Sequence, residues 1–541
     1  MTLGRAQQQA GLWNNAARRC EQGLPARSIF RLLHTEQDRL FPDQLFVDLF
    51  TQVGRRSVPP SIVAVVMVLQ RLEGLSDREA VDRVAFDLRW RYAAGVDDDF
   101  AGFVHTVLVD MRSRLRASGD PDRIFRVTTE LARAAGLVGV RRVLDSAPLF
   151  DAVATQDTVT LLRSAIRGLL RVVSAEVGAK VRALLTREDD YLAPGKPVCD
   201  WDDAAAREQL VDALVRDGYR ALFALRGVRL DAAGREAAQL LATVVGQDIE
   251  ETDDGRFVIA QGVAKDRVIS TVDPQARHGH KTAAHGFDGY KGHVATDPDS
   301  ELITAAEVSQ AATPDAQVAA QLTGDLPPAP STGRPPPPAP EPEPEPESEP
   351  EPAPAVYGDS AYGTGEQLAA LEQRRITPMV KVAVPTAPGG RWAKDHFRID
   401  LDAGTVTCPA KLTVPIRWAP GGGGHARFGR ACSVCPFRQA CTSSPSGRQL
   451  SIHPNERLLA AARARQRDQA WQADYRATRP KVERKLAHLL RRRHGGRRLR
   501  MRGLERAGQD WRLLAAAVNL ARLVVLGLAS TPTGWTVNPA I

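Results

Sequence analysis

The spacing of hydrophobic residues along this chain of 541 residues is helical from residue 28 to residue 140. A mostly apolar run at 61–72 predicts a helix that Gly74 ends. The sequence SDRE at 76–79 is a capping box, so another helix is expected to begin there and continue to Trp90. This helix–turn–helix segment could present a basic face to DNA, or it could have only a structural role. The arginines concerned are Arg78, Arg83, Arg89 and Arg91.

The pattern changes at residues 143–145, where a short apolar segment predicts a strand that ends in the carboxylate of Asp145. Helical spacing returns from residue 158 to about 246. Beyond it, alternating residues predict a series of strands, and a turn at 297–300 joins two of them in a hairpin. The strands are expected at 257–259, 268–272, 289–296 and 301–308.

The second half of the chain begins with a low-complexity segment, 327–355, in which Pro and Glu alternate from 341 to 352. Such a segment cannot bury apolar surface, so we expect an extended, disordered or polyproline-like insertion that serves most simply as a spacer. Regular elements resume at once. We expect a strand at 355–357, a helix at 365–373, a strand at 376–384, and a last strongly helical region at about 455–493.

Composition excludes several classes of protein. With 43% hydrophobic residues the chain can bury a large core, and its apolar stretch 515–529 is interrupted by Asn519 and Arg522, which argues against a membrane span. The N-terminal residues lack the apolar segment of a secretory signal. We therefore expect a cytoplasmic protein, in which the six cysteines do not form a disulfide framework.

The positive charge is concentrated in one segment. The whole chain has a formal charge of +8, but residues 476–506 hold thirteen Lys or Arg and two Glu, a net charge of +11 that leaves −3 for the rest. A basic segment this dense most simply meets the phosphate backbone of DNA, and the alternative is a solvated basic surface.

Two groups of side chains have the chemistry of metal ligands. Two strands that end in Asp and a late helix that bears Glu would bring Asp145, Asp359 and Glu483 to one edge of a mixed sheet. Carboxylates suit Mg²⁺ or Mn²⁺, and a pair of such ions can hold both oxygens of a phosphoryl displacement. Cysteines form the second group and could close a structural Zn²⁺ site or remain reduced and unmetallated. They are Cys408, Cys432, Cys435 and Cys441.

Carboxylates alone do not identify a function, because the chain has 64 acidic residues. Four blocks in order, however, resemble those of bacterial insertion-sequence transposases of the DDE type. They are VLDSAPL (143–149) with DAVATQDT (151–158), FDGYKGHVA (287–295), YGDSAYG (357–363) and RPKVER (479–484). The similarity extends with gaps from about residue 28 to 526. The first block departs from the usual Asp-Ser-Thr at Ala147.

The resemblance implies a ribonuclease-H-like core in which Asp145, Asp359 and Glu483 bind the metal ions. Arg479, one helical turn before Glu483, would orient that carboxylate or contact a phosphate. The family pattern has Tyr three residues before this Arg, where this chain has Arg476 and places its Tyr at 475. The residues proposed to support catalysis or bind DNA are Arg479, Lys291, His293 and Arg476, with a structural role as the alternative for Lys291 and His293. Four other acidic residues beside the motifs could be caps, turn residues or surface charges, namely Asp151, Asp157, Asp288 and Asp315.

The predicted fold is α/β, with a ribonuclease-H-like mixed-sheet core, an N-terminal helical domain, a helical insertion and a Cys-rich loop insertion. The expected boundaries are an N-terminal tail at 1–27, a helical and DNA-binding domain at 28–140, a catalytic domain at 141–157 and 256–526, a helical insertion at 158–255, a disordered Pro/Glu-rich insertion at 325–355, a Cys-rich zinc-binding loop at 400–450 and a C-terminal tail at 527–541.

The predicted function is that of a nucleoid-associated DNA transposase. It would bind the double-stranded ends of its insertion sequence, use a metal ion to activate water for hydrolysis of the end phosphodiester, and join the released 3′-hydroxyl to target DNA. Pairing two ends requires at least a homodimer. One alternative is a metal-dependent nuclease that cuts without joining. Another is a DNA-binding transposase derivative that no longer catalyses the reaction.

Overall fold

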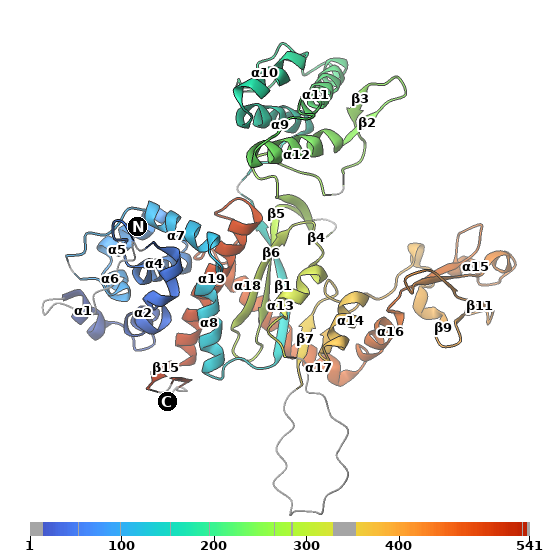
Figure 1. Ribbon diagram of the computed structural model, residues 1–541. Helices are drawn as coiled ribbons and strands as arrows, with labels where there is room; N and C mark the ends of the chain where they lie inside the picture. The colour runs from blue at the N-terminus through green and yellow to red at the C-terminus, as the bar shows by residue number, and fades with distance from the viewer. Residues whose placement is uncertain are drawn as a thin grey trace, which may run out of the picture.

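The computed structural model describes residues 15–327 and 353–537, except for residues 52, 98, 152, 194, 265, 283, 284 and 533. Most of the predicted Pro/Glu-rich insertion, 325–355, lies outside the described residues. The rest is a mixed α/β protein in which helical domains and a smaller β module surround one central sheet (Figure 1).

The central sheet has six strands and mixed pairing. Strand β1 pairs antiparallel with β5 on one side and parallel with β7 on the other, and β7 continues parallel to β8. The first half of β5 pairs with β4 and its second half with β6. The strands are β1 (Arg141–Phe150), β4 (Arg277–Thr282), β5 (His285–Thr296), β6 (Ile303–Gln310), β7 (Ala355–Gly358) and β8 (Thr377–Val380).

The N-terminal domain is helical, as the apolar spacing predicts, and shares one hydrophobic core with the sheet. Its longest helix is buried along nearly its whole length and ends at Gly74, which has a positive φ of 70°. Its helices are α1 (Asn15–Gly23), α2 (Ile29–Thr35), α3 (Gln37–Leu40), α4 (Pro60–Glu73), α5 (Asp77–Phe86), α6 (Leu88–Ala94), α7 (Thr106–Ala117) and α8 (Arg123–Ala134). Helix α1 lies within the predicted N-terminal tail.

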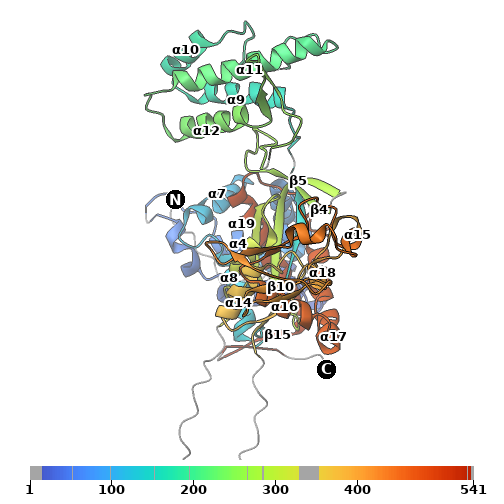
Figure 2. The same ribbon diagram turned by 90° about the vertical axis from the view of Figure 1, so that its right-hand side faces the viewer.

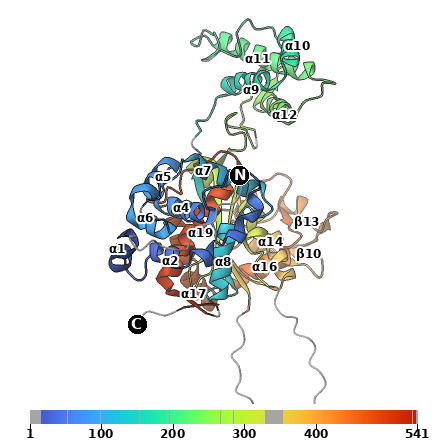
Figure 3. The same cartoon turned by 60° about the vertical axis from the view of Figure 1, so that its left-hand side comes forward.

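The helical insertion projects from the end of the sheet in all three views (Figures 1, 2 and 3). It has a hydrophobic core of its own. Its elements are α9 (Thr158–Val172), α10 (Ala175–Leu184), α11 (Ala204–Ala224), α12 (Ala232–Gly246) and the hairpin of β2 (Ile249–Glu251) and β3 (Phe257–Ile259).

The smaller β module, residues 385–455, follows α14 (Gly365–Gln373) and β8, ends before α16 (Glu456–Arg465), and contains two three-stranded sheets of very short strands. Figure 1 shows it on the side of the central sheet away from the N-terminal helices. Its elements are β9 (Arg398–Asp400), β10 (Thr405–Thr407), β11 (Thr413–Pro415), β12 (Arg417–Trp418), β13 (Gly424–Arg427), α15 (Arg438–Cys441) and β14 (Gln449–Ile452).

The C-terminal part begins with α16, continues through α17 (Gln469–Thr478) and α18 (Pro480–Leu489), and reaches α19 (Leu504–Leu526). The expectation that strong helicity ends near residue 493 is therefore wrong. Helix α19 is buried on most of its faces because it is enclosed by β6, α4 and α8. Among the described residues, no helix is long and apolar enough to cross a membrane. The hairpin of β15 (Leu528–Thr531) and β16 (Gly534–Val537) occupies the predicted C-terminal tail.

Three further expectations about elements are wrong. Asp145 lies inside β1 and not at its end, because pairing with β5 continues to Phe150. The predicted strand at 268–272 is reduced to one bridge, between Val268 and Arg277. The helix expected to continue to Trp90 stops at Phe86, because Asp87 is extended and caps α6 by accepting a hydrogen bond from the backbone N–H of Arg89.

Candidate active site

The three carboxylates predicted from the sequence line one cavity of about 690 Å³. Strands β1 and β7 are parallel neighbours with Val143 opposite Tyr357, so Asp145 and Asp359, each two residues further on, emerge at the same level. Helix α18 packs against β1 and adds Glu483. The sheet register and one helix thus bring together residues more than 330 positions apart in the sequence.

The guanidinium of Arg479 lies between these carboxylates. Its nitrogens are 2.9 Å from an oxygen of Asp145, 3.4 Å from Glu483 and 3.8 Å from Asp359. The side chain of Arg479 is 7% exposed, whereas those of Asp359 and Glu483 are 47% and 62% exposed. One buried cation is therefore shared by three acidic groups, two of which also face solvent.

Burial and the neighbouring charge have opposite effects on the pKa values of Asp145 and Arg479. Burial raises the pKa of Asp145, and the neighbouring Arg479 offsets part of that rise. For Arg479, burial opposes the charged form, but the nearby Asp145 carboxylate outweighs it and raises the pKa of the guanidinium. Arg479 therefore stays protonated and stabilises the ionised form of Asp145.

A second layer of contacts holds Asp145 and involves an acidic residue whose role the sequence did not reveal. The backbone N–H of Ser146 donates to Asp145 Oδ1 at 2.9 Å, and its hydroxyl donates to Asp315 Oδ2 at 2.6 Å. The ammonium of Lys291 lies 2.6 Å from Asp315 Oδ1. Asp315 and Lys291 both line the cavity of the three carboxylates. Asp315 begins a short 3₁₀ helix (Asp315–Val318) that follows β6, and no local pattern in the sequence shows that this turn reaches the cavity.

The other acidic residues near the motifs lie away from this cavity. Asp157 caps α9 by accepting from the backbone N–H of Thr160. Asp288 is half-exposed and pairs with His278 at 2.8 Å. Asp151 accepts from the backbone N–H of Val153. These three have the cap, turn or surface roles that were the alternatives to metal binding.

The three other residues proposed to support catalysis or bind DNA differ in their position relative to the cavity. Lys291 reaches the cavity. His293 is fully buried, with Nε2 2.8 Å from Ser309 Oγ, and burial lowers its pKa to about 4, so of its two predicted roles the structure favours the structural one. Arg476 is not among the residues that line the cavity, and it donates to the carbonyl of Gln472 on its own helix.

Tyr475 reaches the site although it stands one position before the place that the family pattern gives it. Its hydroxyl donates to the carbonyl of Gly358 at 3.1 Å, and Gly358 directly precedes Asp359. Its ring stacks on Trp471 with centroids 4.9 Å apart. Burial raises the pKa of Tyr475 to about 12, so the phenol stays neutral and supports the turn that carries Asp359.

Part of the basic segment continues from the cavity along the end of β1. The side chain of Arg497 lines the cavity. The backbone carbonyl of Arg497 accepts from Phe150 at 2.9 Å, and Leu499 donates to Phe150 at 3.0 Å. Arg491, Arg492, Arg493, Arg497 and Arg498 are exposed, whereas Arg479 and Lys485 are buried. The basic segment therefore contributes both a positive surface and internal ion pairs.

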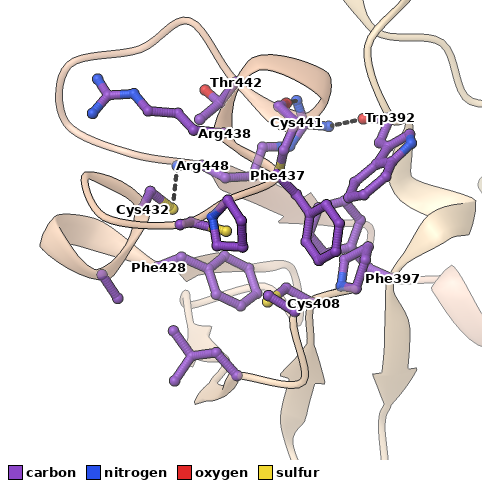
Figure 4. A pocket seen from close by; sticks show the side chains of 16 residues that line it. Trp392, Phe397, Cys408, Phe428, Cys432, Phe437, Arg438, Cys441, Thr442 and Arg448 are labelled. Atoms are coloured by element: carbon purple, nitrogen blue, oxygen red, sulfur yellow. Dashed lines mark hydrogen bonds between the residues drawn. The ribbon is translucent and has the colours of Figure 1, made fainter.

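The four cysteines at 408–441 line a separate pocket of about 250 Å³ in the β module (Figure 4). Cys408 follows β10, Cys432 ends a short 3₁₀ helix, Cys435 lies in the next turn and Cys441 ends α15. All four are free thiols. Cys20 and Cys199 lie elsewhere, on α1 and in the helical insertion.

The acidic set has the donor chemistry of a divalent metal site. Three carboxylates facing one cation are hard anionic oxygen donors, which suit Mg²⁺ or Mn²⁺. As placed within the described parts of the chain, no three His, Cys, Asp or Glu side chains are close enough together to hold a metal ion. In the acidic set, the guanidinium of Arg479 supplies the positive charge that the carboxylates share.

Two segments of the chain match known families. Residues 407–524 match the family model described as a transposase DDE domain, and residues 16–114 match a transposase domain of the DUF772 family. The first match contains Glu483, Arg479 and the four clustered cysteines. The second covers most of the N-terminal helices. Neither a curated protein nor a solved structure gives a significant match.

Proposed function

Because this chain belongs to the DDE-type insertion-sequence transposases, we propose that it cleaves the DNA ends of its own element and joins them to target DNA. The convergence of Asp145, Asp359 and Glu483 on the buried Arg479 is the observation that carries the proposal. These residues come from two parallel strands and one helix, and they open on a single cavity large enough for a phosphodiester.

We propose that the sheet is a ribonuclease-H-like core. Its support is the order of pairing, in which antiparallel β4, β5 and β6 lead to β1, and the parallel strands β7 and β8 follow on the other side. The helical insertion leaves this core after β1 and returns before β4. It therefore lengthens a connection without interrupting the sheet.

Asp145, Asp359 and Glu483 would hold Mg²⁺ or Mn²⁺. A bound divalent ion there supplies positive charge to the oxygens of an in-line phosphoryl displacement. Asp145, the most enclosed of the three, is oriented by the backbone N–H of Ser146, and Tyr475 supports the turn before Asp359. Arg479 stabilises the ionised form of Asp145.

Positive side chains around the cavity would bind the DNA backbone. Lys291 and Arg497 line the cavity, and the exposed arginines at 491–498 extend the positive surface beyond it. Arg476, exposed on α17, would reach only DNA that passes outside the cavity. In the N-terminal domain, Arg83 and Arg89 pair with Asp87, and Arg91 is buried against backbone carbonyls, which leaves a narrower basic face than the sequence predicts.

The reaction would proceed without a covalent link between protein and DNA. Water attacks the phosphodiester first, and the freed 3′-hydroxyl then attacks a target phosphodiester. Since two ends must be paired, at least two copies of the chain would act together on the chromosome. The cavity offers acidic and basic side chains for this chemistry.

The proposal is tested with a labelled duplex that carries the element end, with Mg²⁺, using the native protein, Asp359→Asn and Asp254→Asn. Asp254 is a matched control, an exposed aspartate in the turn between β2 and β3. We expect native protein and Asp254→Asn to cut the end and join it to target DNA, and Asp359→Asn to bind without cutting.

Other outcomes would decide between the alternatives. Cutting without joined products would identify a nuclease. Binding by all three proteins without cutting would favour a DNA-binding derivative. Equal cutting by Asp359→Asn and native protein would place the active site elsewhere, and a trapped protein–DNA adduct would contradict the water-first reaction.

A further inference from the structure

The β module contains four cysteines that reach one pocket from separate parts of its fold. Cys408 comes from the turn after β10, and Cys432, Cys435 and Cys441 come from the irregular segment between β13 and β14. Figure 4 shows Cys408 on one side of this pocket and Cys432 and Cys441 on the other. The two sides belong to different three-stranded sheets, one formed by β9 to β11 and the other by β12 to β14.

The module has little else to hold these sheets together. Its strands are two to four residues long, and its buried cluster has eight members across residues 385–455. Small β units with so few buried side chains usually need disulfides or a structural metal. Its cysteines are free thiols, and Cys408 and Cys432 pack at the edge of the buried cluster.

The charged side chains of the β module are mainly positive. Residues 385–455 contain nine Lys or Arg and three Asp, a net charge of +6. Arg448 spans the pocket wall, with its backbone N–H donating to Cys432 Sγ at 3.4 Å and its guanidinium donating to the carbonyl of Cys441 at 3.3 Å. A Zn²⁺ ion held by four thiolates has a net negative charge, so the positive charge of the module suits such a site.

We propose that Cys408, Cys432, Cys435 and Cys441 bind one Zn²⁺ ion as four thiolates and that this ion joins the two small sheets. As placed, the four thiols line the pocket without forming a ligand group, so binding requires their side chains to turn inward. Each thiol releases its proton on binding, and the resulting site carries a charge of about −2 within the positive module.

This inference does not depend on the proposed transposition activity. The pocket shares no lining residue with the cavity of Asp145, Asp359 and Glu483. Zinc at the cysteines and divalent metal at the carboxylates can therefore be measured separately. A protein that fails to cut DNA can still contain zinc, and a protein without zinc can still be assayed for cutting.

The first test is the metal content of the full chain, purified without chelator, as native protein, Asp359→Asn, Cys408→Ser, Cys435→Ser and Cys199→Ser. We expect one zinc per chain in native protein, Asp359→Asn and Cys199→Ser, and at least a tenfold loss in Cys408→Ser and Cys435→Ser. Cys199 is the matched control, a partly exposed free thiol in the helical insertion. Zinc that is absent from native protein, or that survives both substitutions, would overturn the proposal.

A second test does not require the variants to fold. Native protein in which Co²⁺ replaces Zn²⁺ should show the strong near-ultraviolet sulfur-to-cobalt absorption and the visible bands of a tetrahedral thiolate site. A thiol reagent should label the partly exposed Cys199 of the native protein rapidly, because Cys20 is buried, and should label all six cysteines after chelation and unfolding. Rapid labelling of Cys408, Cys432 or Cys435 in the native protein, or a disulfide within the cluster, would contradict zinc binding. Chelation should also make residues 385–455 sensitive to protease before the remaining chain.

Discussion

The side chain of Arg479 balances the negative charge of the carboxylates in the candidate active site. It is nearly buried and contacts all three carboxylates, so its removal leaves Asp145 with a buried negative charge and no nearby cation. Removal of one partner from a buried ion pair commonly costs about 3 to 5 kcal/mol. Since Asp359 and Glu483 retain access to solvent, Asp145 should bear most of that cost.

We therefore expect Arg479→Met to lower the free energy of unfolding by about 3 kcal/mol in chelator. Arg476→Met is the matched control, because this exposed arginine lies three residues earlier and bonds only to its own helix among the contacts described. Its effect should be below about 0.5 kcal/mol. Denaturant unfolding measures both, and equal effects would show that Arg479 does not stabilise the carboxylates.

Asp315 was considered from the sequence only as a cap, a turn residue or a surface charge, but it lines the cavity. Asp315→Asn should weaken both the ion pair with Lys291 and the orientation of Ser146. Hydrogen bonds to charged groups contribute about 1.5 to 3 kcal/mol, so cleavage should fall by roughly tenfold or more. Lys291, released from its partner, should also make DNA affinity more dependent on salt.

The measurement for Asp315 is the rate of end cleavage together with DNA affinity at several salt concentrations. Asp288→Asn is the control, because Asp288 is a half-exposed aspartate on β5 that does not line the cavity. A fall in cleavage with an unchanged salt dependence would show that Lys291 does not gain a DNA contact. Unchanged cleavage would exclude a positioning role for Asp315.

Lys485 provides a prediction about pH. Burial lowers its pKa from 10.5 to about 8, although Glu301 acts in the opposite direction. Below about pH 8 the folded protein holds a buried ammonium, so the stability cost is fully present there. From about pH 8 to 10.5 the unfolded chain binds more protons than the folded one, and stability rises with pH.

Lys485→Met should accordingly stabilise the protein at pH 7 by up to about 3 kcal/mol, and the advantage should shrink as the pH rises above 8. Lys481→Met, one turn earlier on α18 and 31% exposed, is the control and should have little effect. Unfolding measured at pH 7 and pH 9.5 separates the two. A stabilisation that is the same at both values would contradict the shifted pKa.

At the scale of elements, α19 connects the sheet to the N-terminal domain. Asn519 is buried and bonds to both backbone groups of Ile303, accepting from its N–H at 2.9 Å and donating to its carbonyl at 2.8 Å. These bonds satisfy the start of β6 at a place where water does not reach. Arg71 of α4 also pairs with Asp510 of α19 at 3.1 Å, with both side chains buried.

Asn519→Ala should leave two buried backbone groups without partners and lower the free energy of unfolding by about 2 to 4 kcal/mol. Val525→Ala, at an exposed position of the same helix, should cost less than about 0.5 kcal/mol. Chemical denaturation compares the two variants. Similar small effects would indicate that the start of β6 finds other hydrogen-bond partners.

The β5 pairing shows why elements were easier to predict than their arrangement. Alternation predicts the hairpin of β5 and β6, which the structure confirms with a register from Tyr290 opposite Gln310 to Thr296 opposite Ile303. The same alternation does not reveal that β5 begins earlier and pairs there with β4. Local patterns describe one strand, whereas the number of its neighbours is set by residues distant in sequence.

At the scale of the whole molecule, the helical insertion is a separate folding unit. Its buried residues form a cluster distinct from that of the sheet. Contacts near the junction are polar, as where the side chain of Gln247 bonds to both backbone groups of Val268. The insertion should therefore fold without the catalytic core.

We expect residues 156–272, expressed alone, to have a helical circular dichroism spectrum and a cooperative thermal transition. The matched control is a fragment of 141–157 joined to 273–310, which has β1 and its neighbours but lacks the covering helices. It should show neither property, because its apolar faces remain exposed. A disordered insertion fragment would contradict independent folding.

The sequence alone determined the local features: the capping box at Ser76, the helix end at Gly74, and the spacing of one turn between Arg479 and Glu483. It also identified the acidic residues that the structure brings together. The local features depend on neighbours a few residues away in the sequence. The acidic residues were identified from the order of the four sequence blocks that contain them.

Only the tertiary structure decided which residues share an environment. It buried His293, brought Asp315 and Tyr475 to the site, enclosed α19 and gathered four cysteines at one pocket. Each outcome depends on strand register or on packing between segments far apart in the chain. Such contacts leave no local pattern in the sequence. The same type of residue can lie at the surface, in the core or in the site, and its position depends on the residues that pack against it.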